Sequence, residues 1–183
     1  HIANLMGVDQ TIQYIDGSKF EANAYKNSFV YKTRVMNTRE RLWGNITKTI
    51  VLLNQEYGYC FPYHYRYCSQ EIGYIVQYLM DIMVREEVEI VYGKGKRKST
   101  FQKYYDKLLE YALKLKEYEE NLYICGNRNS YSKTDHDATM MNTKYDYYNQ
   151  TGISKPCYNI QHAVSGGIVM NIGVYQTPED TKT

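Results

Sequence analysis

The sequence predicts a mixed α/β fold, in which one N-terminal strand and a C-terminal β-hairpin share a sheet that a large α-helical insertion interrupts. Three observations support this prediction. Apolar and polar residues alternate just before Asp16, about a hundred residues of helical periodicity follow, and a second alternating pattern begins after Pro156. At 183 residues the chain has the size of one ordinary domain, so we expect residues 1–183 to form one discontinuous domain.

The composition excludes several classes of protein. Hydrophobic residues make up 43% of the chain and charged residues 23%, as in globular rather than disordered proteins. Lys and Arg number 22 and Asp and Glu 20, and this near balance excludes histone-like basic proteins and acidic-tail proteins. Because we find neither an apolar run of about 18 residues nor a signal peptide, we expect a cytoplasmic protein without a membrane contact.

Residues 1–30 contain the first expected strand. Thr11 to Ile15 nearly alternate between polar and apolar residues and are rich in β-branched and aromatic side chains. Asp16-Gly17-Ser18 is a turn signal, so the strand should end there with Asp16 at its tip.

Residues 31–126 should form a set of amphipathic helices that pack together. Apolar side chains recur at helical spacing in three stretches, of which the first runs from Leu42 to Leu53. The expected N-terminal caps are Asn37, Ser69 and Ser99. Glu40 and Gln102 stand three residues after Asn37 and Ser99, where a capping box has its reciprocal residue. The expected C-terminal stops are Gly58 and Gly126.

The rest of the chain changes from polar to β. Residues 127–153 should form a polar linker with a short helix near 138–147. Residues 154–183 should form a β-hairpin and the start of a next segment, with the turn at Ser165-Gly166-Gly167. Gly173 in the second strand indicates a bulge or a close approach of another group.

Asp16 is the first candidate for chemistry. A carboxylate at the end of a core strand is held rigidly and suits Mg²⁺, a cation that prefers oxygen ligands. Two such ions about 4 Å apart activate water and stabilise a leaving phosphate oxygen. Asp-Gly-Ser after a strand is also an ordinary turn, so the spacing alone does not decide between the two.

The run Asp135-His136-Asp137 is the second candidate. Two carboxylates and an imidazole within three residues offer metal ligands. Alternatively, Thr134 or Asp135 caps the short helix that we expect next, and this interpretation is favoured. Pairing of the carboxylates with Arg128 or Lys133 is a further alternative.

The third candidate is the basic run from Gly93 to Ser99. It holds Lys94, Lys96, Arg97 and Lys98 with no acidic residue, and Lys103 extends it. Its spacing does not fit a phosphate-binding P-loop. A flexible basic loop suits contact with a phosphate backbone, but a solvated loop opposite the acidic residues Glu86, Glu87 and Glu89 explains it equally well.

Tyrosine and cysteine each allow a functional and a plain interpretation. The 22 Tyr residues are scattered, which favours drift in composition over a set of stacking platforms for nucleic-acid bases. Cys60, His64 and Cys68 offer three metal ligands at a spacing that fits no common zinc site, so free reduced thiols are favoured.

Four segments match one family in order along nearly the whole chain. They are YIDGSKFEANA (14–24), VYGKGKRKS (91–99), RNSYSKTDHDATMM (128–141) and KPCYNIQ (155–161). Together they resemble bacterial insertion-sequence transposases of the DDE type, whose first segment reads DGT-K-x-EANA. The fourth segment departs from the family, which usually has Gly where this chain has Cys157.

The resemblance implies a partial ribonuclease H-like fold with a helical insertion after its first strand. In this family three acidic residues bind two Mg²⁺ ions, and Asp16 matches the first of them. The other two are expected beyond Thr183, so Asp180 is not taken as the second ligand. The family's helical DNA-binding region is expected upstream of His1. The chain therefore resembles an internal fragment.

The implied activity is metal-dependent DNA strand cleavage and transfer of an insertion sequence, with Mg²⁺ as cofactor and DNA as partner. Lys94, Lys96, Arg97, Lys98 and Lys103 are the expected DNA contacts. With one of three acids, the fragment alone should be inactive and should bind Mg²⁺ poorly. The complete protein is expected to assemble as a homo-oligomer. The alternatives are a nuclease on the same fold and a non-enzymatic helical interaction or DNA-binding module.

Overall fold

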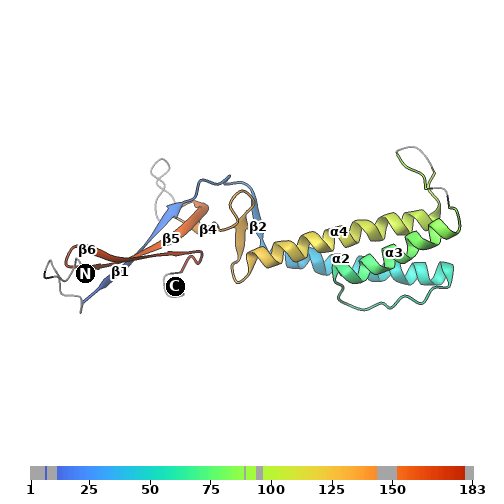
Figure 1. Cartoon of the computed structure of the whole chain (residues 1–183), viewed down its shortest axis with the longest axis horizontal. Helices are drawn as coiled ribbons and strands as arrows, with labels where there is room; N and C mark the ends of the chain where they lie inside the picture. Colours follow the sequence, from blue (N-terminus) through green and yellow to red (C-terminus); the bar gives the residue numbers. More distant parts are fainter. Residues whose placement is uncertain (1–6, 8–11, 89, 94–96, 144–151, 180–183) are drawn as a thin grey trace. The chain divides into compact units, whose positions relative to one another are not determined.

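The structure is a computed structural model that describes residues 7, 12–88, 90–93, 97–143 and 152–179 (Figure 1). Its elements are β1 (Tyr14–Glu21), β2 (Phe29–Tyr31), α2 (Lys32–Tyr57), α3 (Ser69–Arg85), α4 (Thr100–Cys125), β3 (Ser130–Ser132), β4 (Thr139–Asn142), β5 (Ser154–Ser165) and β6 (Ile168–Tyr175). The described residues thus contain three helices and two antiparallel sheets, and the predicted mixed α/β class is confirmed.

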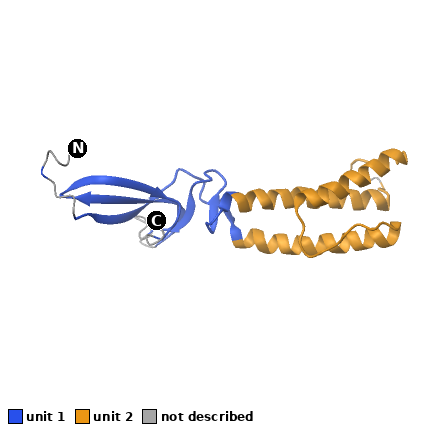
Figure 2. Ribbon diagram, turned by 60° about the horizontal axis from the view of Figure 1, so that its bottom comes forward, with its two compact units in different colours: residues 1–32, 124–183 blue, residues 33–123 orange. Residues whose placement is uncertain are grey.

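The chain divides into two compact units, which Figure 2 colours separately. The sheet unit comprises residues 1–32 and 124–183, and the helical unit comprises residues 33–123. In sequence, the helices therefore lie between β2 and β3.

Strand β5 is the centre of the larger sheet. β1 pairs with one edge of β5 over its full length, from Tyr14 opposite Val164 to Glu21 opposite Cys157. β4 and β6 follow one another along the other edge of β5, since Cys157 also pairs with Thr139 of β4 and residues 159–165 pair with β6. All of these pairings are antiparallel.

The β5–β6 hairpin confirms the predicted turn. Gly166 and Gly167 have φ angles of 54° and 80°, the left-handed values that a two-residue hairpin turn needs. The bulge of this hairpin lies between Ala163 and Val164, away from Gly173. Gly173 marks a close approach instead, because a Cβ atom there would meet the ring of Tyr175.

The prediction that the first strand ends at Asp16 was wrong. β1 begins at Tyr14 and continues to Glu21, so Asp16 is its third residue. Gly17 and Ser18 lie opposite Gln161 and Ile160 of β5, and this ladder overrides the local turn preference of the Asp-Gly-Ser sequence. Thr11, where the predicted strand began, lies outside the described residues.

Three strands were not predicted. β2 and β3 pair with each other through three residues each, which is too short for a periodic pattern. β4 stands where the short helix near 138–147 was predicted, because pairing of its four residues with β5 outweighs their helix propensity. Residues 144–147 of that predicted helix lie outside the described residues.

The predicted helix ends agree with the structure better than the predicted starts. Gly58 and Gly126 follow α2 and α4 directly, with φ angles of 69° and 52°. α2 begins at Lys32, so Asn37 and Glu40 lie inside it and the capping box predicted there was wrong.

The other two predicted caps differ from the structure in detail. The N-cap of α3 is Cys68 rather than Ser69, and the Cys68 backbone N–H donates to the Glu71 carboxylate at 2.9 Å. At α4 the Ser99 hydroxyl accepts from the Gln102 backbone N–H at 3.1 Å, as predicted. The Gln102 side chain bonds elsewhere, as described below.

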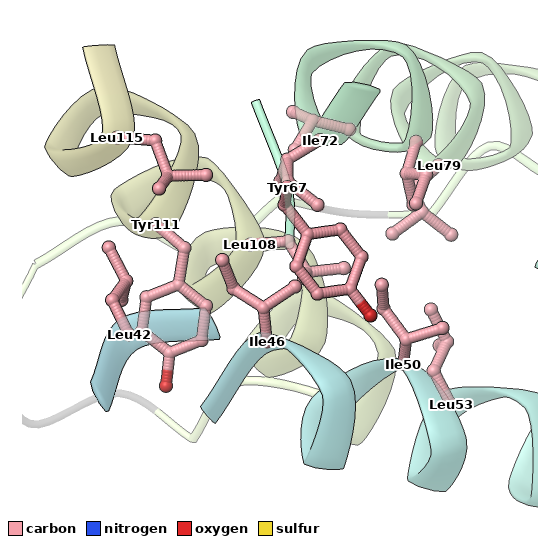
Figure 3. Close-up of a cluster of buried hydrophobic side chains, with 12 residues drawn as sticks. Leu42, Ile46, Ile50, Leu53, Tyr67, Ile72, Leu79, Leu108, Tyr111 and Leu115 are labelled. Atoms are coloured by element: carbon pink, nitrogen blue, oxygen red, sulfur yellow. The ribbon is translucent and has the colours of Figure 1, made fainter. Parts of the chain in front are cut away.

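The helical unit has its own hydrophobic core, in which side chains of the three helices converge (Figure 3). The predicted stripe of α2 is buried, with Ile46, Ile50 and Leu53 fully inside. Several apolar side chains of the larger sheet are exposed instead. Tyr14 is 73% exposed, Ile172 58% and Val174 62%, so no layer of described residues covers them.

No helix within the described ranges has both the length and the apolar character needed to cross a membrane.

Candidate functional site

Asp16 is held in β1 by its pairing with β5. Its cross-strand partner is His162, which pairs in turn with Ile172 of β6. Because directly opposed residues project from the same face, Asp16, His162 and Ile172 share one face of the sheet. The Asp16 side chain is exposed and has no hydrogen bond or ion pair with another described residue.

A single carboxylate does not make a magnesium site. The described residues contain no group of three or more His, Cys, Asp or Glu side chains that could hold a metal ion. Mg²⁺ normally takes six ligands in an octahedral arrangement. Asp16 in this chain therefore does not fit a complete site, and we assign no reaction step to a metal bound here.

The segment with Cys60, His64 and Cys68 does not form a metal site either. The His64 ring stacks on Tyr67 with a centroid distance of 4.4 Å, and its Nε2 lies 3.9 Å from Glu71 Oε1. Cys60 and Cys68 are exposed free thiols. Cys125 and Cys157 are buried free thiols, and burial raises the pKa of each.

Asp135-His136-Asp137 forms a turn rather than a helix start. Asp135 Oδ1 accepts from the backbone N–H of Asp137 at 3.2 Å, and its Oδ2 accepts from the Tyr158 hydroxyl at 2.6 Å. This second bond, together with burial, raises the pKa of Tyr158 to about 12. The predicted cap of a following helix was therefore wrong, because β4 follows the turn.

Arg128 contacts this turn through the backbone. It donates to the carbonyl oxygens of His136 and Asp137 at 2.7 and 3.1 Å, and to that of Ile124 at 2.7 Å. Asp137 Oδ1 accepts from Gln176 Nε2 at 2.9 Å. These contacts of Asp135 and Asp137 thus serve to hold the turn against β5 and the residues after β6.

The chain is anchored in the helical unit just before the basic run and at its last residue. Gln102, which is 1% exposed, bonds both polar backbone groups of Val91: its Oε1 accepts from the N–H at 3.1 Å and its Nε2 donates to the carbonyl at 2.8 Å. Ser99 at the other end caps α4. Lys94 and Lys96 lie between these anchors but outside the described residues.

The described basic residues differ in how available their charges are for contact with another molecule. Arg97 and Lys103 are exposed at the start of α4, where the helix dipole adds positive potential. Lys98 instead pairs with Asp106 of α4, with Nζ 2.7 Å from Oδ2. Sequence reasoning missed this pair, although Asp106 stands only eight residues further along. Asp16 and these basic residues belong to different units.

Comparisons of this chain with protein-family models, curated proteins and solved structures find no match. What the chain does must therefore be inferred from its own residues and their arrangement.

Proposed function

We propose that this chain is part of a DDE-type transposase, which cleaves DNA at the ends of an insertion sequence and joins it to a target. Asp16 is then one of three acidic residues that hold the catalytic metal ions. The basic residues before and within the first turn of α4 contact DNA. The resemblance of the four segments carries this proposal, and a ribonuclease H-like fold is the architecture that it implies.

The packing of three of those segments supports the proposal. Residues 14–24 contain β1, and residues 155–161 belong to its partner β5. Residues 128–141 contain the first three residues of β4, which pairs with the other edge of β5, and Asp135, which accepts from Tyr158. Segments that are far apart in the sequence, resemble one family and contact one another are expected of a single catalytic domain.

The state of Asp16 also favours this role. A carboxylate engaged in an ion pair would have to lose that partner before binding a metal, and Asp16 has none among the described residues. Mg²⁺ supplies activation of water and stabilisation of the leaving oxygen when it is bound in such enzymes. Because one carboxylate does not hold it, we expect this chain alone to bind DNA without cleaving it.

A binding module without catalysis is the second candidate. The helical unit has a complete core of its own, and the anchored basic run belongs to this unit. This candidate shares the DNA contact but assigns no chemistry to Asp16.

The DNA contact can be tested on this chain. The binding of a short fluorescent duplex is followed by anisotropy between about 50 and 200 mM salt. We expect affinity to fall with salt. The double variant Arg97→Glu/Lys103→Glu should weaken binding and reduce the slope of log affinity against log salt by about 2. Asp106→Asn should strengthen binding, because it removes the carboxylate that pairs with Lys98.

The matched control is Lys48→Glu/Lys116→Glu, which reverses two exposed charges elsewhere in the helical unit. It changes the net charge equally, so a specific contact predicts near-normal binding for this variant. Equal losses in both double variants would mean that only net charge matters, and no measurable binding by the unaltered chain would refute a DNA contact at this loop.

A further inference from the structure

An open cleft lies within the helical unit, between residues 58–68 and α3. Its volume is about 390 Å³, in the range of small-ligand sites. Four aromatic side chains line it: Phe61, Tyr67, Tyr74 and Tyr78. His64 supplies an imidazole and Glu71 a carboxylate to its lining. No part of the proposed function uses this cleft.

The loop side of the cleft is held in place by α2. Asn54 bonds both polar backbone groups of Phe61: its Nδ2 donates to the carbonyl at 2.8 Å and its Oδ1 accepts from the N–H at 3.1 Å. The Trp43 indole N–H donates to the Tyr67 carbonyl at 2.8 Å, and the Thr47 hydroxyl donates to the His64 carbonyl at 2.9 Å. These bonds pre-organise the wall before any ligand arrives.

The aromatic walls present ring faces and edges. Phe61 and Tyr78 meet edge to face, with centroids 5.5 Å apart and planes at 83°. Tyr67 is buried, and Figure 3 shows its ring among core side chains of the helices. Tyr74 is 76% exposed and Tyr78 48%, so both remain accessible to a ligand. A cation placed against such rings is attracted by their negative faces.

The charge of the lining favours a cationic ligand. Glu71 Oε2 accepts from the Cys68 N–H at 2.9 Å, while the nearest described basic group to Oε1 is His64 Nε2, at 3.9 Å. The carboxylate is half-exposed, and the described residues that line the cleft include no Lys or Arg. The lining lacks the positive charge that a nucleic-acid phosphate would need.

We propose that this cleft receives an arginine side chain of a partner protein. A guanidinium group stacks on aromatic rings and bonds a carboxylate through its planar fork, and it is less strongly hydrated than an ammonium group. The same loop exposes Tyr63 and Tyr65, by 61% and 92%, and exposed Tyr is enriched where proteins meet. Guanidinium N–H groups donate to Glu71 Oε1 while the plane lies against the Tyr74 and Tyr78 rings.

Trp43 provides the readout. It is the single Trp of the chain and bonds the Tyr67 carbonyl, so its fluorescence reports on this wall. The 183-residue chain is titrated with the peptide Gly-Arg-Gly and with Gly-citrulline-Gly, whose side chain has the same shape without the charge. We expect saturable binding of the arginine peptide, with a dissociation constant on the order of 1 mM, and at least about tenfold weaker binding of the citrulline peptide.

Two variants test the assigned contacts. Glu71→Gln keeps an acceptor for the Cys68 N–H, so the cap of α3 persists while the charge is removed. It should weaken binding of the arginine peptide about fivefold. Tyr74→Ala, at an exposed position, should weaken it about threefold. Glu117→Gln and Tyr123→Ala alter exposed residues of α4 outside the cleft, and should leave binding unchanged.

Several outcomes would overturn the proposal. These are equal binding of the citrulline peptide, full binding by both Glu71→Gln and Tyr74→Ala, or no saturable response to the arginine peptide. Saturable binding of choline without binding of the arginine peptide would assign the cleft to quaternary ammonium groups instead. Binding of thymidine that persists in Glu71→Gln would assign it to base stacking.

Discussion

The hydrogen bond between Tyr158 and Asp135 is a single contact that ties β5 to the turn after β3. Two causes raise the pKa of Tyr158 from 10.0 to about 12. The larger is this hydrogen bond, which the hydroxyl donates only when it is protonated, and the second is burial. In the unfolded chain the hydroxyl ionises near its ordinary pKa. The contribution of this residue to stability is therefore complete below pH 10 and is lost as the pH rises to about 12.

This linkage gives the first prediction. The unfolding free energy of the unaltered chain should exceed that of Tyr158→Phe by a constant amount up to pH 10, and the difference should shrink between pH 10 and about 12. Urea denaturation of both proteins at several pH values measures it. A difference that stays constant through this range would contradict the assigned hydrogen bond.

Individual residues differed in how well they could be predicted. Gly166 and Gly167 were recognisable because only a residue that tolerates positive φ suits a two-residue turn. Ser99 was recognisable as a cap for a similarly local reason. The setting of Asp16 was not, because its strand is extended by pairing with residues far along the chain. The Tyr158–Asp135 contact likewise depends on tertiary structure.

Two helix glycines allow the effect of backbone strain on stability to be measured apart from the effect of helix propensity. Gly58 ends α2 with a φ of 69°, and a Cβ there would meet nothing within 4 Å. Gly73 lies inside α3, where an added Cβ would likewise meet nothing within 4 Å, but its φ is not positive. The same substitution at the two positions should therefore act in opposite directions.

The second prediction follows from this pair. Gly58→Ala should destabilise the chain by about 1 kcal/mol, because it strains a left-handed residue. Gly73→Ala should stabilise it by about 0.5–1 kcal/mol, because alanine favours the helix and restricts the unfolded chain. Thermal or urea unfolding gives both values. A loss of stability at both positions would show that α3 does not tolerate the added methyl group.

Elements were predictable in proportion to their length. The long amphipathic helices carry enough turns for their apolar stripes to be recognised, and Leu42 and Ile46 are buried as expected. β2 and β3 have three residues each and depend on each other for their form. β4 was mistaken for helix because its strand state comes from pairing with β5.

The two units of the molecule differ in how far their apolar side chains are buried. The helical unit encloses a core of three helices, whereas the larger sheet leaves Tyr14, Ile172 and Val174 more than half exposed. Burial of apolar area is the main source of stability, so local opening should cost less in the sheet unit. The mixed class was predictable from the sequence, but the exposure of these side chains was not, because it depends on which elements pack against the sheet.

The third prediction concerns this difference. In native-state hydrogen exchange, backbone amides of α2 and α3 that form helical hydrogen bonds should be protected longer than the paired amides of β1 and β6. Mass spectrometry of peptides from the intact chain measures both. Equal protection would mean that the two units open together.

We propose that Asp16 is a catalytic acid of a DDE transposase, and this assignment can be tested on the complete gene. The most direct measurement is to sequence the DNA on both sides of this coding segment, express the continuous reading frame, and assay Mg²⁺-dependent cleavage at the element's ends. We expect the frame to continue into two further acids between inverted repeats, and Asp16→Asn to abolish cleavage while Asp81→Asn, on exposed α3 surface, does not. A frame without those acids, or full cleavage by Asp16→Asn, would contradict the claim.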